Sequence, residues 1–68
     1  MSRKATIIDD GGRYVLVRGN TRAALKDVPG MWSNRDRGRW IRRERLADVI
    51  ARLELARIDA DVIRGDAA

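Results

Sequence analysis

The chain has 68 residues, enough for one small domain, and its 15 Lys and Arg against 10 Asp and Glu give a formal net charge of +5. It has no cysteine and no histidine, which excludes disulfides, Cys/His zinc sites and the side chain best suited to proton transfer near neutral pH. No apolar run approaches the ~20 residues of a membrane span. We therefore expect a cytoplasmic, non-enzymatic protein without metal or cofactor, in which one domain spans residues 1–68, with an ordered core over 4–63 and a frayed tail over 64–68.

The first half of the chain predicts a hairpin and a short helix. Two segments rich in β-branched residues, 5–10 and 13–18, flank Gly11 and Gly12. The Asp-Gly-Gly sequence between them tolerates positive φ, which is typical of a β-hairpin turn. We expect a helix over 21–27, because a capping side chain precedes this segment and a Pro-Gly pair ends it.

The two tryptophans predict a second hairpin. Trp32 and Trp40 flank a turn-rich segment, 34–38. A turn centred on Asp36 would place them directly opposite each other on one face, as a structural aromatic pair. Since the chain has no phenylalanine, we expect both tryptophans to be buried in the core. The alternative is that they are exposed and stack on unpaired bases.

After Arg43 the apolar residues recur with the spacing of an amphipathic helix. The spacing i, i+3, i+4, i+7 is met by Leu46, Val49, Ile50 and Leu53. Residues 58–62 then alternate apolar and acidic side chains, which favours a strand over 57–63, although a single helix over 43–63 fits as well. The resulting order, ββαββαβ, predicts a two-layer α+β domain in which an antiparallel sheet carries two helices on one face.

Basic charge is concentrated around the second hairpin. The start of the last helix carries Arg42, Arg43 and Arg45, where acids and capping side chains are preferred. Such departures from local preference are most frequent at functional sites, and a phosphate placed there would meet both guanidinium groups and free N–H groups. The candidate nucleic-acid-binding residues are therefore Arg35, Arg37, Arg39, Arg42, Arg43 and Arg45. The alternative is a solvated basic face, partly neutralised by Asp36 and Glu44.

Two acidic pairs offer oxygen ligands to a cation. The first is Asp9 with Asp10, beside the glycines of the first turn, and the second is Asp59 with Asp61. Neither pair has a third ligand nearby in sequence. Turn formation and protection of a strand edge explain them better, so no metal site is predicted.

Most of the chain resembles the HARP-type module, which accompanies some annealing helicases. The resemblance rests on the sequence VPGMW at 28–32, on Trp40 eight residues after Trp32, and on the helix that follows, and it extends over residues 5–63. The family commonly has one more residue before the first aromatic and a proline at the position of Arg42. The resemblance implies a small α+β domain that contacts DNA near forks or single-strand/duplex junctions.

These observations predict a small DNA-binding accessory module that holds phosphates with its arginines and reads little sequence. We expect DNA rather than RNA as the partner. The alternative is a phage-type interaction effector that docks on a host protein or forms a homodimer. Its contact surface would be the sheet face away from the helices, with Ile7, Tyr14, Leu16 and Ile41.

Overall fold

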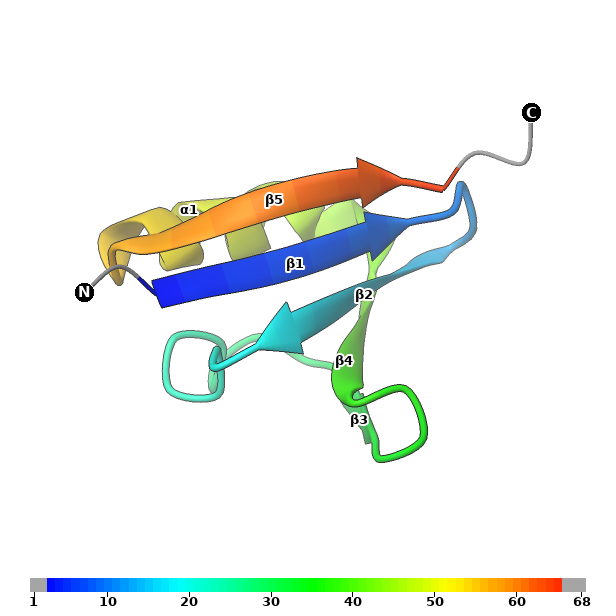
Figure 1. Cartoon of the computed structure of the whole chain (residues 1–68), viewed down its shortest axis with the longest axis horizontal. Coiled ribbons are helices and arrows are strands. Elements are labelled where there is room, and N and C mark those ends of the chain that lie inside the picture. The colour runs from blue at the N-terminus through cyan, green and yellow to red at the C-terminus, as the bar shows by residue number, and fades with distance from the viewer. Residues whose placement is uncertain (1–2, 66–68) are drawn as a thin grey trace.

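A five-stranded mixed sheet with an α-helix against one face forms the molecule (Figure 1). The computed structural model describes residues 3–65. The elements, in chain order, are β1 (Arg3–Asp9), β2 (Tyr14–Gly19), β3 (Met31–Ser33), β4 (Gly38–Arg42), a 3₁₀ turn η1 (Arg43–Arg45), α1 (Leu46–Leu55) and β5 (Ile58–Arg64). The strand order is β3-β4-β2-β1-β5. The prediction of an α+β domain is therefore confirmed.

The first hairpin is confirmed and is closed by side chains of its own turn. The Gly11 N–H donates to Asp9 Oδ1 over 3.0 Å, and the Gly12 N–H donates to Asp10 Oδ1 over 2.9 Å. Gly11 has a φ of +89°, which a residue with a side chain rarely adopts. The two acids of the first acidic pair thus serve the turn.

Residues 21–27 form a series of turns, so the predicted first helix is wrong. The Leu25 N–H donates to the Thr21 carbonyl and the Val28 N–H to the Leu25 carbonyl, over 2.9 and 3.0 Å. A segment this short gains too few helical hydrogen bonds to offset helix nucleation. The segment is held instead by Leu25 and Val28, which are fully buried in the core. The order of strands and helix is consequently ββββαβ.

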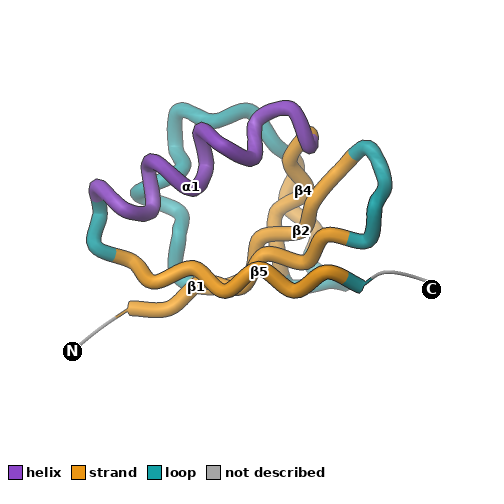
Figure 2. The backbone as a smooth tube through the Cα atoms, turned by 90° about the horizontal axis from the view of Figure 1, so that it is seen from above, coloured by secondary structure: helices purple, strands orange, loops and turns teal. Residues whose placement is uncertain are grey.

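The sheet is mixed, which corrects the predicted antiparallel sheet. The pairs β1–β2, β2–β4 and β3–β4 are antiparallel, whereas β5 pairs with β1 in parallel. Figure 2 shows α1 on one side of the sheet, between the end of β4 and the start of β5. A helical crossover of this kind returns the chain to the same end of the sheet, so that β5 runs in the direction of β4.

The hydrophobic core lies between the sheet and α1. The predicted apolar stripe of the helix is confirmed: Val49 and Leu53 are fully buried, and Leu46 and Ile50 pack against the core while partly buried. Aliphatic side chains fill the whole core, and its buried members are Ala5, Ile7, Val15, Val17, Leu25, Val28, Ile41, Val49, Leu53 and Ile58.

The helix ends without a glycine, and a strand follows it as predicted. Arg57 adopts the left-handed conformation, with a φ of +58°, and its N–H donates to the Glu54 carbonyl over 3.0 Å. This turn redirects the chain into β5. The predicted frayed tail begins too early, because Arg64 ends β5 and the Gly65 N–H donates to the Asp9 carbonyl over 2.9 Å. Residues 66–68 lie outside the described part of the chain.

The register of the second hairpin separates the two tryptophans. Met31 pairs with Trp40, and Trp32 pairs with Arg39, so the predicted aromatic pair is wrong. A shift of one residue moves a side chain to the other face of a strand. Trp40 therefore lies half-buried on the helix-free face, whereas Trp32 lies on the opposite face with 62% of its surface exposed. Neither tryptophan belongs to the core between the sheet and α1, so the predicted burial of both in the core is also wrong.

Candidate nucleic-acid interface

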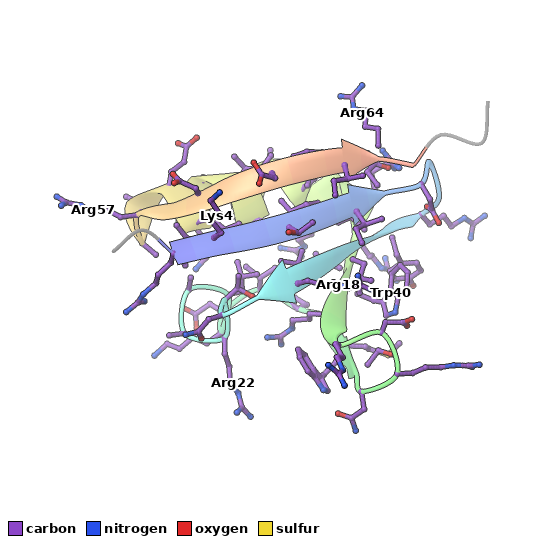
Figure 3. The ribbon with its side chains drawn as sticks, viewed as in Figure 1. Lys4, Arg18, Arg22, Trp40, Arg57 and Arg64 are labelled. Atoms are coloured by element: carbon purple, nitrogen blue, oxygen red, sulfur yellow. The ribbon has the colours of Figure 1, made fainter. Side chains whose placement is uncertain are left out.

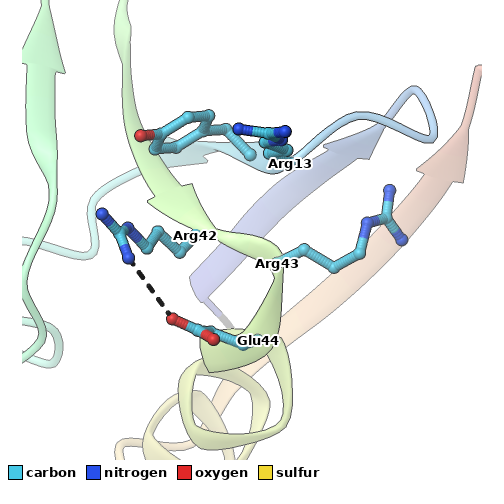
Figure 4. Close-up of a pocket in the computed structure, with 5 residues that line it drawn as sticks. Arg13, Arg42, Arg43 and Glu44 are labelled. Atoms are coloured by element: carbon cyan, nitrogen blue, oxygen red, sulfur yellow. Dashed lines mark ion pairs between the residues drawn. The ribbon is translucent and has the colours of Figure 1, made fainter.

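Arg43 is engaged with the turn of the first hairpin. Its Nη1 donates to Asp9 Oδ2 over 2.9 Å, its Nη2 donates to Asp9 Oδ1, and its Nε donates to the Gly12 carbonyl over 2.7 Å. Figure 4 shows the Arg43 side chain directed away from Arg42 and Glu44. Since all three donor nitrogens are used within the molecule, Arg43 fixes η1 to the β1–β2 turn and is not free to hold a phosphate.

The Asp9–Arg43 pair makes stability depend on pH. The hydrogen bonds from Arg43, and then the one from the Gly11 N–H, lower the pKa of the Asp9 carboxyl below its ordinary value. A carboxyl with a depressed folded-state pKa contributes stability above its unfolded pKa of ~3.9, and this contribution is lost as pH falls through the folded pKa. We expect Asp9→Asn to lower the melting temperature at pH 7, and to lower it by less at pH 2. Thermal melts at both pH values, with Asp10→Asn as the control, test this, and equal losses at both pH values would contradict it.

Two of the three predicted helix-start arginines, Arg42 and Arg43, line a shallow hollow of mixed charge. Arg13, Tyr14, Arg42, Arg43 and Glu44 line a volume of about 450 Å³. Arg42 Nη1 lies 3.7 Å from Glu44 Oε1, and both side chains are exposed. As predicted, neither η1 nor α1 has a side-chain cap at its start. Because Arg42 pairs with Glu44 and Arg43 pairs with Asp9, Arg13 is the one lining arginine without an ion pair within residues 3–65.

The loop between β3 and β4 is organised by Asp36. Its carboxylate Oδ2 accepts hydrogen bonds from Ser33 Oγ over 2.9 Å and from Trp40 Nε1 over 3.1 Å. These two donors, Ser33 first, lower the pKa of the Asp36 carboxyl. The Asp36 carboxylate forms no ion pair within residues 3–65, and the neighbouring Arg35 and Arg37 are exposed there without an ion pair or a side-chain hydrogen bond.

A second hollow lies beside Trp32 and contains no carboxylate among its lining residues. Its volume is about 510 Å³, and its lining residues are Gly19, Asn20, Thr21, Arg22, Trp32 and Arg39. The Trp32 indole Nε1 donates to Asn34 Oδ1 over 2.7 Å, which fixes the ring. We call this the Trp32 hollow. Sequence reasoning missed Asn20 and Arg22, because only the folding of the 20–29 loop beside the second hairpin brings them to Trp32.

The six predicted arginines do not form one patch. Arg42 and Arg45 lie at the η1 end of β4, whereas Arg35 and Arg37 lie in the loop at its other end. Arg39 and Arg42 are three positions apart on β4, so strand alternation places them on opposite faces of the sheet. Arg22 and Arg39 line the Trp32 hollow, and Arg35 and Arg37 lie in the loop between β3 and β4; we call these four residues the hairpin arginines. Within the described residues none of them forms an ion pair.

The helix-free face of the sheet carries a row of apolar side chains across all the strands. The registers align Met31, Trp40, Leu16, Ile8 and Ile63. Of the residues predicted for this face, Leu16 belongs to the row and Tyr14 lies next to it on β2. Ile7 and Ile41 are wrong, because both point to α1 and are fully buried in the core.

Comparisons with known proteins identify no relative of this chain. No family model matches the chain, and no curated protein or solved structure shows detectable similarity to it. The resemblance to the HARP-type module therefore stays a prediction. No helix in the described part of the chain is long and apolar enough to cross a membrane.

Proposed function

We propose that this protein binds DNA through the hairpin arginines. The observation that carries the proposal is the gathering of Arg22, Arg35, Arg37 and Arg39 around the second hairpin, with no ion pair to a carboxylate among residues 3–65. A guanidinium group makes two parallel charge-assisted hydrogen bonds to a phosphate, which suits arginine to nucleic-acid backbones. Such contacts position a protein without reading bases, so we expect little sequence specificity.

The hairpin arginines differ from the six arginines predicted from the sequence, because Arg42, Arg43 and Arg45 are left out and Arg22 is added. Arg43 is excluded because Asp9 neutralises its charge and because each of its three nitrogens already donates to Asp9 or to the Gly12 carbonyl. Arg42 and Arg45 are at most peripheral, since Glu44 lies between them in the chain and lines the same surface. The resemblance to the HARP-type module supports DNA over RNA as the partner.

Paired substitutions test this site. We expect Arg35→Gln with Arg37→Gln to lower the affinity for a fluorescein-labelled 12-nucleotide single strand about tenfold, measured by fluorescence anisotropy at 50 mM salt; tenfold equals about 1.4 kcal/mol. The control is Arg57→Gln with Arg64→Gln, which removes the same charge at opposite ends of the molecule (Figure 3). The control should bind within about threefold of wild type. Equal losses of affinity in the two variants would show that binding depends on net charge and not on this site. The absence of wild-type binding would refute the function.

A second candidate function is self-association through the helix-free face. The apolar row on this face crosses all five strands. A two-fold axis through Leu16, parallel to the strands, would lay the apolar row of one copy over the apolar row of the other. A core this small supplies only ~3–5 kcal/mol, which self-association would supplement.

Light scattering tests self-association directly. We expect a dimer for wild type at 100 µM, and a monomer for Ile63→Lys, because a charge at the row would be buried in the interface. The matched control is Leu55→Lys, at a position on α1 that is 85% exposed, and it should remain dimeric. A wild-type monomer at every concentration would contradict this second function.

A further inference from the structure

We infer that the Trp32 hollow binds one unpaired nucleotide of a single strand, with its base stacked on the Trp32 indole and its phosphate held by Arg22 and Arg39. This inference rests on the proposed function and names its substrate class. It assigns the basic hairpin to single-stranded rather than duplex DNA.

Trp32 is presented to solvent in a fixed orientation. It lies on the edge strand β3 with 62% of its surface exposed, although indole is among the side chains that gain most from burial. The hydrogen bond of 2.7 Å from its Nε1 to Asn34 Oδ1 restrains the rotation of the ring. A held, exposed aromatic face loses little conformational freedom when a base stacks on it, and such stacking tolerates any base.

The lining of the hollow suits a nucleotide. The volume of about 510 Å³ lies within the range of small-molecule sites. Arg22 and Arg39 supply positive charge, and the Asn20 amide offers both a donor and an acceptor to a base edge. No carboxylate lines it, whereas Glu44 lines both the hollow beside Arg13 and a neighbouring one beside Arg45. The charge of this hollow therefore favours an anionic ligand.

Arg39 occupies a position where an apolar side chain would be more stable. It lies on β4 between Val17 and Trp32, and its Nε is buried without a hydrogen-bond partner. An unsatisfied buried donor destabilises the fold. A Cβ atom at Gly30 would lie 3.0 Å from this Nε, so the glycine leaves the room that the guanidinium group needs. Local choices that disfavour stability are most frequent at ligand sites, which is where we place Arg39.

A single strand fits this arrangement better than a duplex or a free nucleotide. A duplex keeps its bases stacked on one another and offers none to Trp32. A free nucleotide would use the hollow alone and leave Arg35 and Arg37 without a ligand. These two arginines are exposed in the loop that follows β3, and we assign to them the phosphates next to the stacked nucleotide.

Substitution of Trp32 tests the inference. We expect Trp32→Ala to weaken binding of a dT12 single strand about 5- to 150-fold in fluorescence anisotropy, and to change binding of a 12-base-pair duplex less than twofold. Trp32→Phe should restore most of the single-strand affinity, since a phenyl ring also stacks. The matched control is Met31→Ala, which removes an exposed side chain from the same strand but from the opposite face, and it should not alter single-strand binding. Circular dichroism melts of each variant verify folding.

The outcomes separate this inference from the proposed function. Loss of affinity in the Arg35→Gln, Arg37→Gln variant together with unchanged binding by Trp32→Ala would overturn the Trp32 site and leave DNA binding in place. Equal losses on single strand and duplex for Trp32→Ala would also overturn it. If dTMP alone binds as tightly as dT12, the ligand is a free nucleotide and the single-strand assignment is wrong. Absence of wild-type binding to every oligonucleotide would overturn both proposals.

Discussion

Replacing Leu53 by alanine is expected to lower the free energy of unfolding by about 2–5 kcal/mol, the range for truncating a buried leucine. Leu53 is fully buried between α1 and the sheet, where the side chains around it have no slack to fill a cavity. A chain of this size holds only ~3–5 kcal/mol in total, so the variant should be largely unfolded at 25 °C. Urea unfolding followed by circular dichroism measures the change.

Leu55 supplies the control on the same helix. It lies two residues after Leu53 with 85% of its surface exposed. Leu55→Ala should change the free energy of unfolding by less than about 0.5 kcal/mol, because the substitution removes no buried contact and alanine is a good helix former. Equal destabilisation by the two variants would contradict the orientation of α1 on the sheet.

Raising the salt concentration from 50 to 200 mM should weaken single-strand binding about 50-fold. Each phosphate contact on a single strand contributes a slope of about −0.7 to log K against log salt, so the hairpin arginines together predict a slope near −2.8. Arg35→Gln with Arg37→Gln should reduce the slope by about 1.4, whereas Trp32→Ala should leave it unchanged because stacking releases no counterions. Anisotropy titrations at four salt concentrations give the slopes.

A slope near zero for wild type would show that phosphates are not the ligand. A slope that Arg35→Gln with Arg37→Gln leaves unchanged would show that other basic groups make the contacts. Either result would contradict the assignment to the hairpin arginines.

Local pattern was sufficient to predict most of the secondary structure. The Gly-Gly turn, the 3.6-residue period after Arg43 and the apolar–acidic alternation after Arg57 each act over a few residues, and each predicted the element that forms. The prediction of a helix over 21–27 was wrong, because its capping and stop signals are local whereas the conformation of the segment is set by Leu25 and Val28 in the core. The prediction that β5 pairs in an antiparallel direction was wrong for a related reason, because the direction of β5 depends on the path of α1 across the sheet.

The candidate site depended more strongly on tertiary contacts. Sequence identified an arginine-rich second hairpin, but the Asp9–Arg43 pair joins residues 34 positions apart and has no local signal. The sheet face on which each of Trp32 and Trp40 lies depends on the register of the second hairpin, and this register differs from the predicted one by a single residue. Arg22 reaches the site only through the loop that replaces the predicted helix. Composition thus suggested that the candidate site is rich in arginine, but it did not indicate where on the fold the candidate site lies.

The most direct measurement is a ¹H–¹⁵N correlation spectrum of the ¹⁵N-labelled protein titrated with dT12. If a single strand binds at the Trp32 hollow, the signals of the Trp32 indole N–H and of the backbone amides of 20–22 and 34–39 should shift, with little change at 42–45 and on α1. Shifts confined to the amides of 42–45, or a spectrum that dT12 leaves unchanged, would contradict it.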